Sequence, residues 1–203
     1  MSLDKFIGIE RKIDNTIPSV FINILGGNAT GKSGIVGRIK QKYDNKVIAL
    51  GKYSRSKTSI GLLTGGMDMY GSTQIQRFSY IKRHFLSNKQ VLLCEGFIVV
   101  FYESFLSKYY ELQKIKHRTV YAILLHADLD VLQKRLFKRS KGKEFTTKRL
   151  KNLNSKASSA NASYNKLIET DTYKKTKFDT SDPKIFDEVV NYISEIIDGV
   201  LLE

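Results

Sequence analysis

The chain has 203 residues, of which 41% are hydrophobic and 27% are charged. This balance suits one domain with a sizeable core and excludes a disordered chain, and no apolar run approaches the roughly 20 residues that a membrane span needs. The single cysteine, Cys94, excludes an internal disulfide, and with three histidines it is too little for a structural zinc site.

The charge is strongly positive. Lys and Arg number 34 against 20 Asp and Glu, which gives a net charge of +14. Such an excess attracts anions and favours nucleic acid as a partner. The alternative is a compositional bias, because lysine outnumbers arginine and proline is nearly absent, as in a chain from an AT-rich genome.

Strand-like and helix-like segments alternate along the chain. Short apolar runs predict buried strands at 20–25, 47–50, 91–94, 120–125 and 177–180. Between them, helical spacing of apolar residues predicts helices, one beginning at about Lys32, one capped by Ser72, one over 101–113, one started by Asp128 or Asp130, one over 150–167 and one opened by Asp182-Pro183. The segment 51–71 is predicted to be a long polar loop. This order predicts one α/β domain over 1–203, with a five-stranded, mostly parallel sheet covered by helices on both faces.

A phosphate-binding loop is predicted where the first strand meets the first helix. The run is Gly26-Gly27-Asn28-Ala29-Thr30-Gly31-Lys32-Ser33, which fits the pattern G-x4-G-K-[ST]. Glycines let several backbone N–H groups converge on phosphate oxygens, and the helix that follows directs its positive end at the anion. Lys32 would reach the β- and γ-phosphates of ATP, and the Ser33 hydroxyl would bind Mg²⁺. The predicted fold is therefore the three-layer fold of P-loop NTPases.

A basic segment follows the fourth predicted strand. Residues 134–156 hold ten Lys or Arg and one acid, Glu144, and no guanine-reading Asn-Lys-x-Asp motif follows that strand. A small chain with such a segment resembles the nucleotide and polynucleotide kinases and not a switch GTPase, and the resemblance implies a lid at about 138–156 that closes over the phosphates. Arg135 and Arg139 are four residues apart and are the candidate lid arginines, expected to face away from Leu132 and Leu136. The alternative is a solvated basic face. The end of the last predicted strand, Phe178-Asp179-Thr180-Ser181, also resembles that of these kinases, which makes Thr180 and Ser181 candidates for contact with the adenine base.

Two acids are candidates for the chemistry of an alcohol kinase. Glu95 ends the third predicted strand, where strand ends face the crevice of an α/β sheet, and it could hold Mg²⁺ through water or act as the base. Asp68 lies in the glycine-rich part of the long loop. The resemblance to this kinase superfamily implies that an acid in this part of the fold binds the acceptor hydroxyl. The alternative for Glu95 is an acid that merely caps a loop, and the alternative for Asp68 is an ordinary turn aspartate.

Three features together resemble the phage P-loop kinases that phosphorylate 5-hydroxymethyluracil within DNA. They are Gly65-Gly66-Met67-Asp68, Glu95-Gly96-Phe97 and the basic segment from Arg135, and the resemblance runs from about 20 to 179. It implies ATP and Mg²⁺ as cofactors, a hydroxymethyl group on a flipped-out DNA base as the acceptor, and the cytoplasm of a phage-infected bacterium as the location. Lys52, Arg55 and Lys57 could then follow the DNA backbone.

Two other functions stay open. A kinase of free nucleosides or nucleoside monophosphates would use the same phosphate loop and lid, with Arg77 and Arg83 on the acceptor phosphate or, alternatively, simply facing solvent. A non-catalytic, ATP-dependent nucleic-acid binder would bind DNA and form no product.

Overall fold

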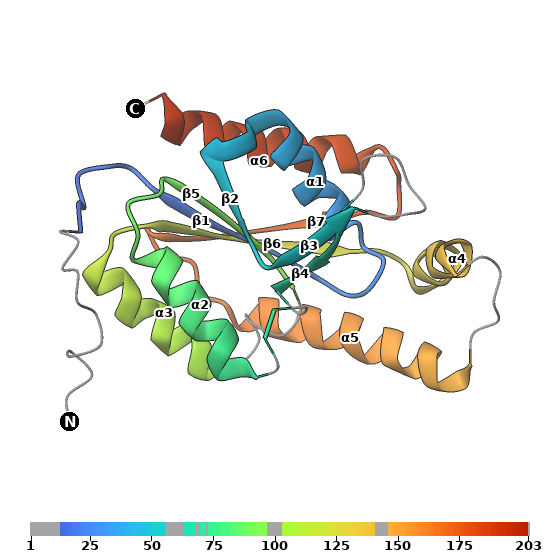
Figure 1. Ribbon diagram of the computed structural model, residues 1–203. Coiled ribbons are helices and arrows are strands. Elements are labelled where there is room, and N and C mark those ends of the chain that lie inside the picture. The colour runs from blue at the N-terminus through green and yellow to red at the C-terminus, as the bar shows by residue number, and fades with distance from the viewer. Residues whose placement is uncertain are drawn as a thin grey trace.

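The computed structural model describes residues 13–55, 63–67, 70–71, 73–96, 103–140 and 146–202. A parallel sheet of five strands forms its centre (Figure 1). In sheet order the strands are β2 (Val47–Leu50), β5 (Val91–Glu95), β1 (Val20–Gly26), β6 (Thr119–His126) and β7 (Tyr173–Asp179). The predicted α/β fold is confirmed, and β7 begins four residues before the predicted last strand because its first half is too polar to be recognised as a strand.

Helices cover both faces of the sheet, as Figure 1 shows. Side chains alternate along β1, so that Phe21 and Leu25 join one core cluster and Ile22 and Ile24 the other. The seven residues of β1 are all buried, as expected of the central strand in a sheet covered on both faces. One layer holds α1 (Lys32–Tyr43) and α6 (Ile185–Leu201), and the other holds α2 (Gln74–Phe85), α3 (Glu103–Ile115) and α5 (Thr147–Lys166).

The segment predicted as one long polar loop contains a hairpin instead. Strands β3 (Lys52–Arg55) and β4 (Leu63–Gly66) pair antiparallel and form a separate small sheet. A Cβ at Gly65 would lie 2.0 Å from the Lys52 carbonyl oxygen, so only glycine permits this pairing. The prediction failed because this hairpin lacks the alternating apolar residues that mark a strand in sequence.

Two helix starts also differ from the prediction. Helix α2 is capped by Thr73, not Ser72. The Thr73 hydroxyl accepts from the Gln76 N–H at 3.2 Å, and the Gln76 side-chain oxygen accepts from the Thr73 N–H at 3.2 Å, which completes a capping box. Helix α6 begins at Ile185, since Asp182 accepts from the Lys184 N–H at 2.8 Å and so caps the preceding turn. Helix α4 (Leu129–Arg139) begins after Asp128, one of its two predicted starts.

A buried arginine ties the α2 layer to the sheet. Arg118, just before β6, is 1% exposed and donates to the carbonyl oxygens of Phe85, Ser87 and Lys89 at 2.6, 2.5 and 2.7 Å. Burial lowers the pKa of Arg118 to about 10. These bonds satisfy the end of α2, so this cation has a structural role. Within the described ranges, no helix combines the length and apolar character that crossing a membrane would require.

Candidate active site

The phosphate loop joins the end of β1 to the start of α1. Its backbone takes positive φ at Gly26 (140°), Ala29 (63°) and Gly31 (98°), which curls the chain around its own N–H groups. A Cβ at Gly26 would lie 2.3 Å from the Leu125 carbonyl oxygen, so the neighbouring strand β6 also requires glycine there. The loop therefore has the geometry expected of a phosphate cradle in front of a helix N-terminus.

Lys32 folds back over this loop. Its ammonium donates to the carbonyl oxygens of Gly26 at 3.0 Å and Gly27 at 2.6 Å, and the buried Thr30 hydroxyl donates to Gly27 at 3.1 Å. A phosphate in the loop would compete with these carbonyls for the ammonium, because a charged acceptor forms the stronger bond.

Arg135 of α4 reaches the phosphate loop and the turn after β7 together. One guanidinium nitrogen donates to the Thr180 carbonyl, and the other lies 3.4 Å from the Thr180 hydroxyl and 3.5 Å from the Ala29 carbonyl oxygen. The Thr180 hydroxyl is buried, 2.9 Å from the His126 carbonyl oxygen and 3.3 Å from that of Thr30. Arg135 and Thr180 thus hold the loop against the ends of β6 and β7.

Glu95 ends β5, the strand directly beside β1. It is 2% exposed and pairs in register with Ile24, which places it on the α1 side of the sheet. Gly66, the last residue of β4, packs against it, because a Cβ there would lie 3.1 Å from the Glu95 Cγ and Cδ atoms. The chain thus brings a buried carboxylate to the edge of the sheet where the phosphate loop begins.

A cavity of about 480 Å³ lies between the phosphate loop and the two helices of the predicted lid. Its lining comes from the loop, from the end of α4 and from one face of α5: Asn28, Leu136, Arg139, Ser140, Arg149, Asn152, Leu153 and Lys156. The α5 residues recur at i, i+3, i+4 and i+7, a spacing readable in the sequence, although none of them was predicted to be a site residue. Helix α5 also contacts the loop, since a Cβ at Gly27 would lie 3.4 Å from the Ala157 backbone.

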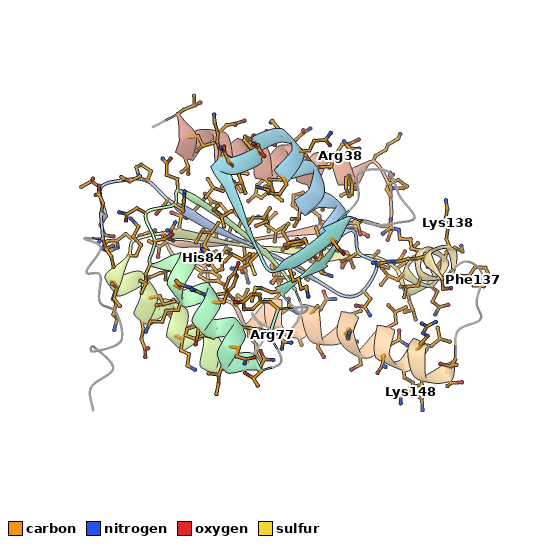
Figure 2. The ribbon with its side chains drawn as sticks, viewed as in Figure 1. Arg38, Arg77, His84, Phe137, Lys138 and Lys148 are labelled. Carbon is orange, nitrogen blue, oxygen red and sulfur yellow. The ribbon has the colours of Figure 1, made fainter. Side chains whose placement is uncertain are left out.

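The structure corrects two expectations about arginines. Leu136 was expected to lie away from Arg139, but both line this cavity, because residues three apart are neighbours on a helix. Arg77 is buried and neither faces solvent nor projects outward (Figure 2): it donates to the carbonyl oxygens of Tyr70 at 2.9 Å and Gly71 at 3.1 Å, which fixes the turn before α2.

The other residues predicted to bind the acceptor include Lys52, Arg55 and Asp68. Lys52 is exposed on β3. Asp68, the Arg55 side chain and residues 141–145 of the predicted lid lie outside the described part of the chain.

His126 and Asp179 end β6 and β7 in register, with a nitrogen-to-oxygen distance of 3.9 Å. Burial and then Lys177 lower the pKa of His126, against the opposite effect of Asp179.

No protein-family model and no curated protein matches this sequence. Solved structures do match. The structure of the YorR protein of Bacillus subtilis in complex with phosphorylated GDP aligns with 86% of this chain and 96% of its own, at 15% identity and a TM-score of 0.56. A candidate kinase from Chloroflexus aurantiacus aligns with 90% of this chain and 97% of its own, at 14% identity and a TM-score of 0.55. The chain therefore shares with these structures a three-layer α/β fold, in which a five-stranded parallel sheet is covered by helices on both faces.

Proposed function

We propose that this protein is an ATP-dependent phosphotransferase that moves the γ-phosphate of ATP to a hydroxyl group. The observation that carries the proposal is the phosphate loop at Gly26–Ser33, with the buried carboxylate of Glu95 on the adjacent strand and two arginine-bearing helices beside it. In an open α/β sheet, ligands bind at the carboxyl ends of the strands where the chain changes direction across the sheet. Here that place is at β1, because the chain passes from β5 on one side of β1 to β6 on the other.

Each group has a separate task in the proposed reaction. The loop N–H groups and Lys32 hold the β- and γ-phosphates, and Glu95 or Asp68 orients the acceptor hydroxyl and takes its proton. Arg139 lines the cavity beside Asn28, and in this proposal it stabilises charge on the transferred phosphoryl group. Arg135 supports the loop backbone, and Thr180 and Ser181 stay candidates for contact with the adenine.

Mg²⁺ fits the residues at this edge. The Ser33 hydroxyl follows Lys32 at the start of α1, and the buried Glu95 carboxylate lies on the same side of the sheet as that helix. One hydroxyl and one carboxylate, completed by phosphate oxygens and water, form a usual ligand set for Mg²⁺. The ion would neutralise charge on the β- and γ-phosphates.

For the acceptor, we favour the hydroxymethyl group of 5-hydroxymethyluracil in DNA. The support is the net charge of +14 and the exposed lysines on α4 and α5, among them Lys134, Lys138, Lys148 and Lys151. Lys52 and Arg55 on β3 are further candidates for the DNA backbone. A free nucleoside or nucleoside monophosphate is the second candidate acceptor, favoured by a cavity whose 480 Å³ suits a small molecule.

The test is transfer of label from γ-labelled ATP to three acceptors: DNA containing 5-hydroxymethyluracil, the same DNA with thymine, and free nucleosides. We expect transfer to the modified DNA, and we expect Lys32→Ala to reduce it by at least 100-fold with little loss of fold. Lys46→Ala, an exposed lysine after the same helix, is the control. Near-normal transfer by Lys32→Ala would overturn the loop assignment. DNA binding without any product would indicate a non-catalytic binder instead.

A further inference from the structure

The two halves of the phosphate loop are held by different parts of the protein. The first half lies against β6 and α5. In the second half, the Thr30 carbonyl oxygen accepts from the Thr180 hydroxyl at 3.3 Å. The Ala29 carbonyl oxygen lies 3.5 Å from a guanidinium nitrogen of Arg135, which is itself bound to Thr180. The turn after β7 therefore supports two successive residues of the loop, and the third, Gly31, has a different neighbour.

That neighbour is Phe186, in the first turn of α6. A Cβ at Gly31 would lie 3.6 and 3.7 Å from Cδ2 and Cε2 of the Phe186 ring, so the ring covers the glycine at van der Waals distance. Gly31 is the N-cap of α1, with φ of 98°, and its carbonyl oxygen accepts from the N–H groups of Gly34 and Ile35 at 3.0 and 3.1 Å. The direction of the free N–H groups at the start of α1 thus depends on how Gly31 is packed.

The Phe186 ring is in turn held by α1. Arg38 extends from α1 to the start of α6 (Figure 2), with its guanidinium carbon 5.6 Å from the centroid of the Phe186 ring. Arg38 also pairs with Asp187, the next residue of α6, at 3.5 Å. Phe186 itself is half-buried and packs against the core cluster on the α1 side of the sheet. One aromatic ring therefore joins the start of α6 to two places on α1, the N-cap and a point two turns later.

We propose that Phe186 is a positioning residue of the nucleotide site, which keeps Gly31 and the first N–H groups of α1 directed at the phosphates. The proposal rests on the phosphotransferase function proposed for this protein. Its effect passes through the loop backbone, because Phe186 contacts Gly31 and has no group that binds phosphate. A shift of a binding group by about 1 Å can cost on the order of 100-fold, so losing this support should be measurable. The alternative is that Phe186 only fills the core between α1 and α6.

Calorimetry in the presence of Mg²⁺ distinguishes the two roles, with two ligands: a non-hydrolysable ATP analogue and inorganic tripolyphosphate, which has no base. We expect Phe186→Ala to weaken both by the same factor, about tenfold or more. Phe186→Leu keeps an apolar side chain in the core and should still weaken both by about threefold or more. Phe186→Tyr keeps the ring atoms that touch Gly31 and should stay within about twofold of the wild type.

Tyr192→Ala is the matched control on the same helix. Tyr192 is also half-buried, but its ring lies 5.5 Å from that of Phe178 and its hydroxyl lies 2.8 Å from the Thr176 hydroxyl. This variant should lower the Tm about as much as Phe186→Ala does and leave both affinities unchanged. If Phe186→Ala binds tripolyphosphate as the wild type does, or weakens only the ATP analogue, the positioning role is overturned. The same holds if Tyr192→Ala weakens both ligands equally.

These measurements separate the positioning role from the proposed reaction, because binding needs no transfer. A wild type that binds both ligands in a Phe186-dependent manner, yet transfers phosphate to no hydroxyl, would count against the phosphotransferase function alone. Transfer that is intact in the wild type, with equal triphosphate affinity in Phe186→Ala, would count against the role of Phe186 alone. A wild type that binds neither ligand would overturn both.

Discussion

Gly66 lies directly against the side chain of Glu95. A Cβ at position 66 would be 3.1 Å from the Cγ, the Cδ and the carbonyl oxygen of Glu95. Gly66 also has φ of 119°, a conformation that side-chain-bearing residues rarely adopt. The end of the β3–β4 hairpin is therefore fitted to the one described acid that we place at the reaction centre.

We expect Gly66→Ala to lower the free energy of unfolding by about 1–3 kcal/mol, because the new Cβ strains the backbone and displaces Glu95. The rate of phosphoryl transfer should also fall, because the Glu95 carboxylate is displaced. Thermal unfolding and kcat measure the two effects. Gly199→Ala is the control: among the described residues, no atom beyond the neighbouring turns of α6 lies within 4 Å of the added Cβ, and the change should stabilise the helix by about 0.5–1 kcal/mol. A Gly66→Ala protein with normal stability and kcat would contradict this packing.

Arg135→Ala should reduce kcat by tenfold or more, because the phosphate loop loses the guanidinium that joins Ala29 to Thr180 and keeps only the bond from the Thr180 hydroxyl to Thr30. The loss of stability should stay at about 1–2 kcal/mol, the value of one or two hydrogen bonds on a half-buried side chain. Chemical denaturation and steady-state kinetics distinguish the two. Lys134→Ala is the neighbouring control, since its pair with Asp130 is exposed and contributes little. Equal kcat values for the two variants would refute the role of Arg135.

Asn23→Val should stabilise the protein by about 1 kcal/mol or more. Asn23 is 1% exposed in the middle of β1, and neither its amide nitrogen nor its oxygen has a hydrogen-bond partner within the described part of the chain. A buried amide without partners costs free energy that an apolar, strand-favouring residue does not. In contrast, Ser19→Ala should destabilise, because the buried Ser19 hydroxyl donates to the His117 carbonyl oxygen at 3.1 Å. Urea unfolding measures both changes, and destabilisation by Asn23→Val would show that the amide is in use.

Acid should weaken the fold through two histidines. Burial, and then Arg83, lower the pKa of His84 below its usual 6.5, and burial, and then Lys177, do the same for His126. Below pH 6.5 the unfolded chain therefore binds more protons than the folded one, so stability falls as the pH drops through 6.5 and levels off below the folded-state pKa values. His84→Gln and His126→Gln should each flatten the dependence of unfolding free energy on pH between about 7 and 5. An unchanged slope in both variants would assign the effect to other groups.

Local patterns predicted those parts of the molecule whose residues are contiguous. The phosphate loop needs eight successive residues with the right backbone freedom, and the structure has that curl between β1 and α1. Buried strands were found for the same reason, because a run such as 91–94 is apolar throughout. The β3–β4 hairpin was missed, since its pairing depends on glycines that permit close backbone approach and not on an apolar period.

Side-chain direction was harder to predict. Arg77 occupies a helix position that suggested either substrate contact or solvent, yet it is held by two backbone carbonyls of the preceding turn. Arg135 and Arg139 were grouped as one pair, yet they reach different partners. In each case the partner lies in a turn or loop, and the spacing of residues along a helix does not specify where that turn or loop runs.

The sequence by itself determined the alternation of strands and helices, the phosphate loop and the basic segment after the fourth strand of the sheet, because each depends on local spacing and composition. Only the tertiary structure decided that Glu95 stands beside β1, that Gly66 packs on it, and that Arg139, Arg149 and Lys156 face one cavity at Asn28. Those relationships follow from the order of strands in the sheet and from the packing of α4 and α5. Both are set by contacts between residues far apart in the chain, which no local pattern specifies.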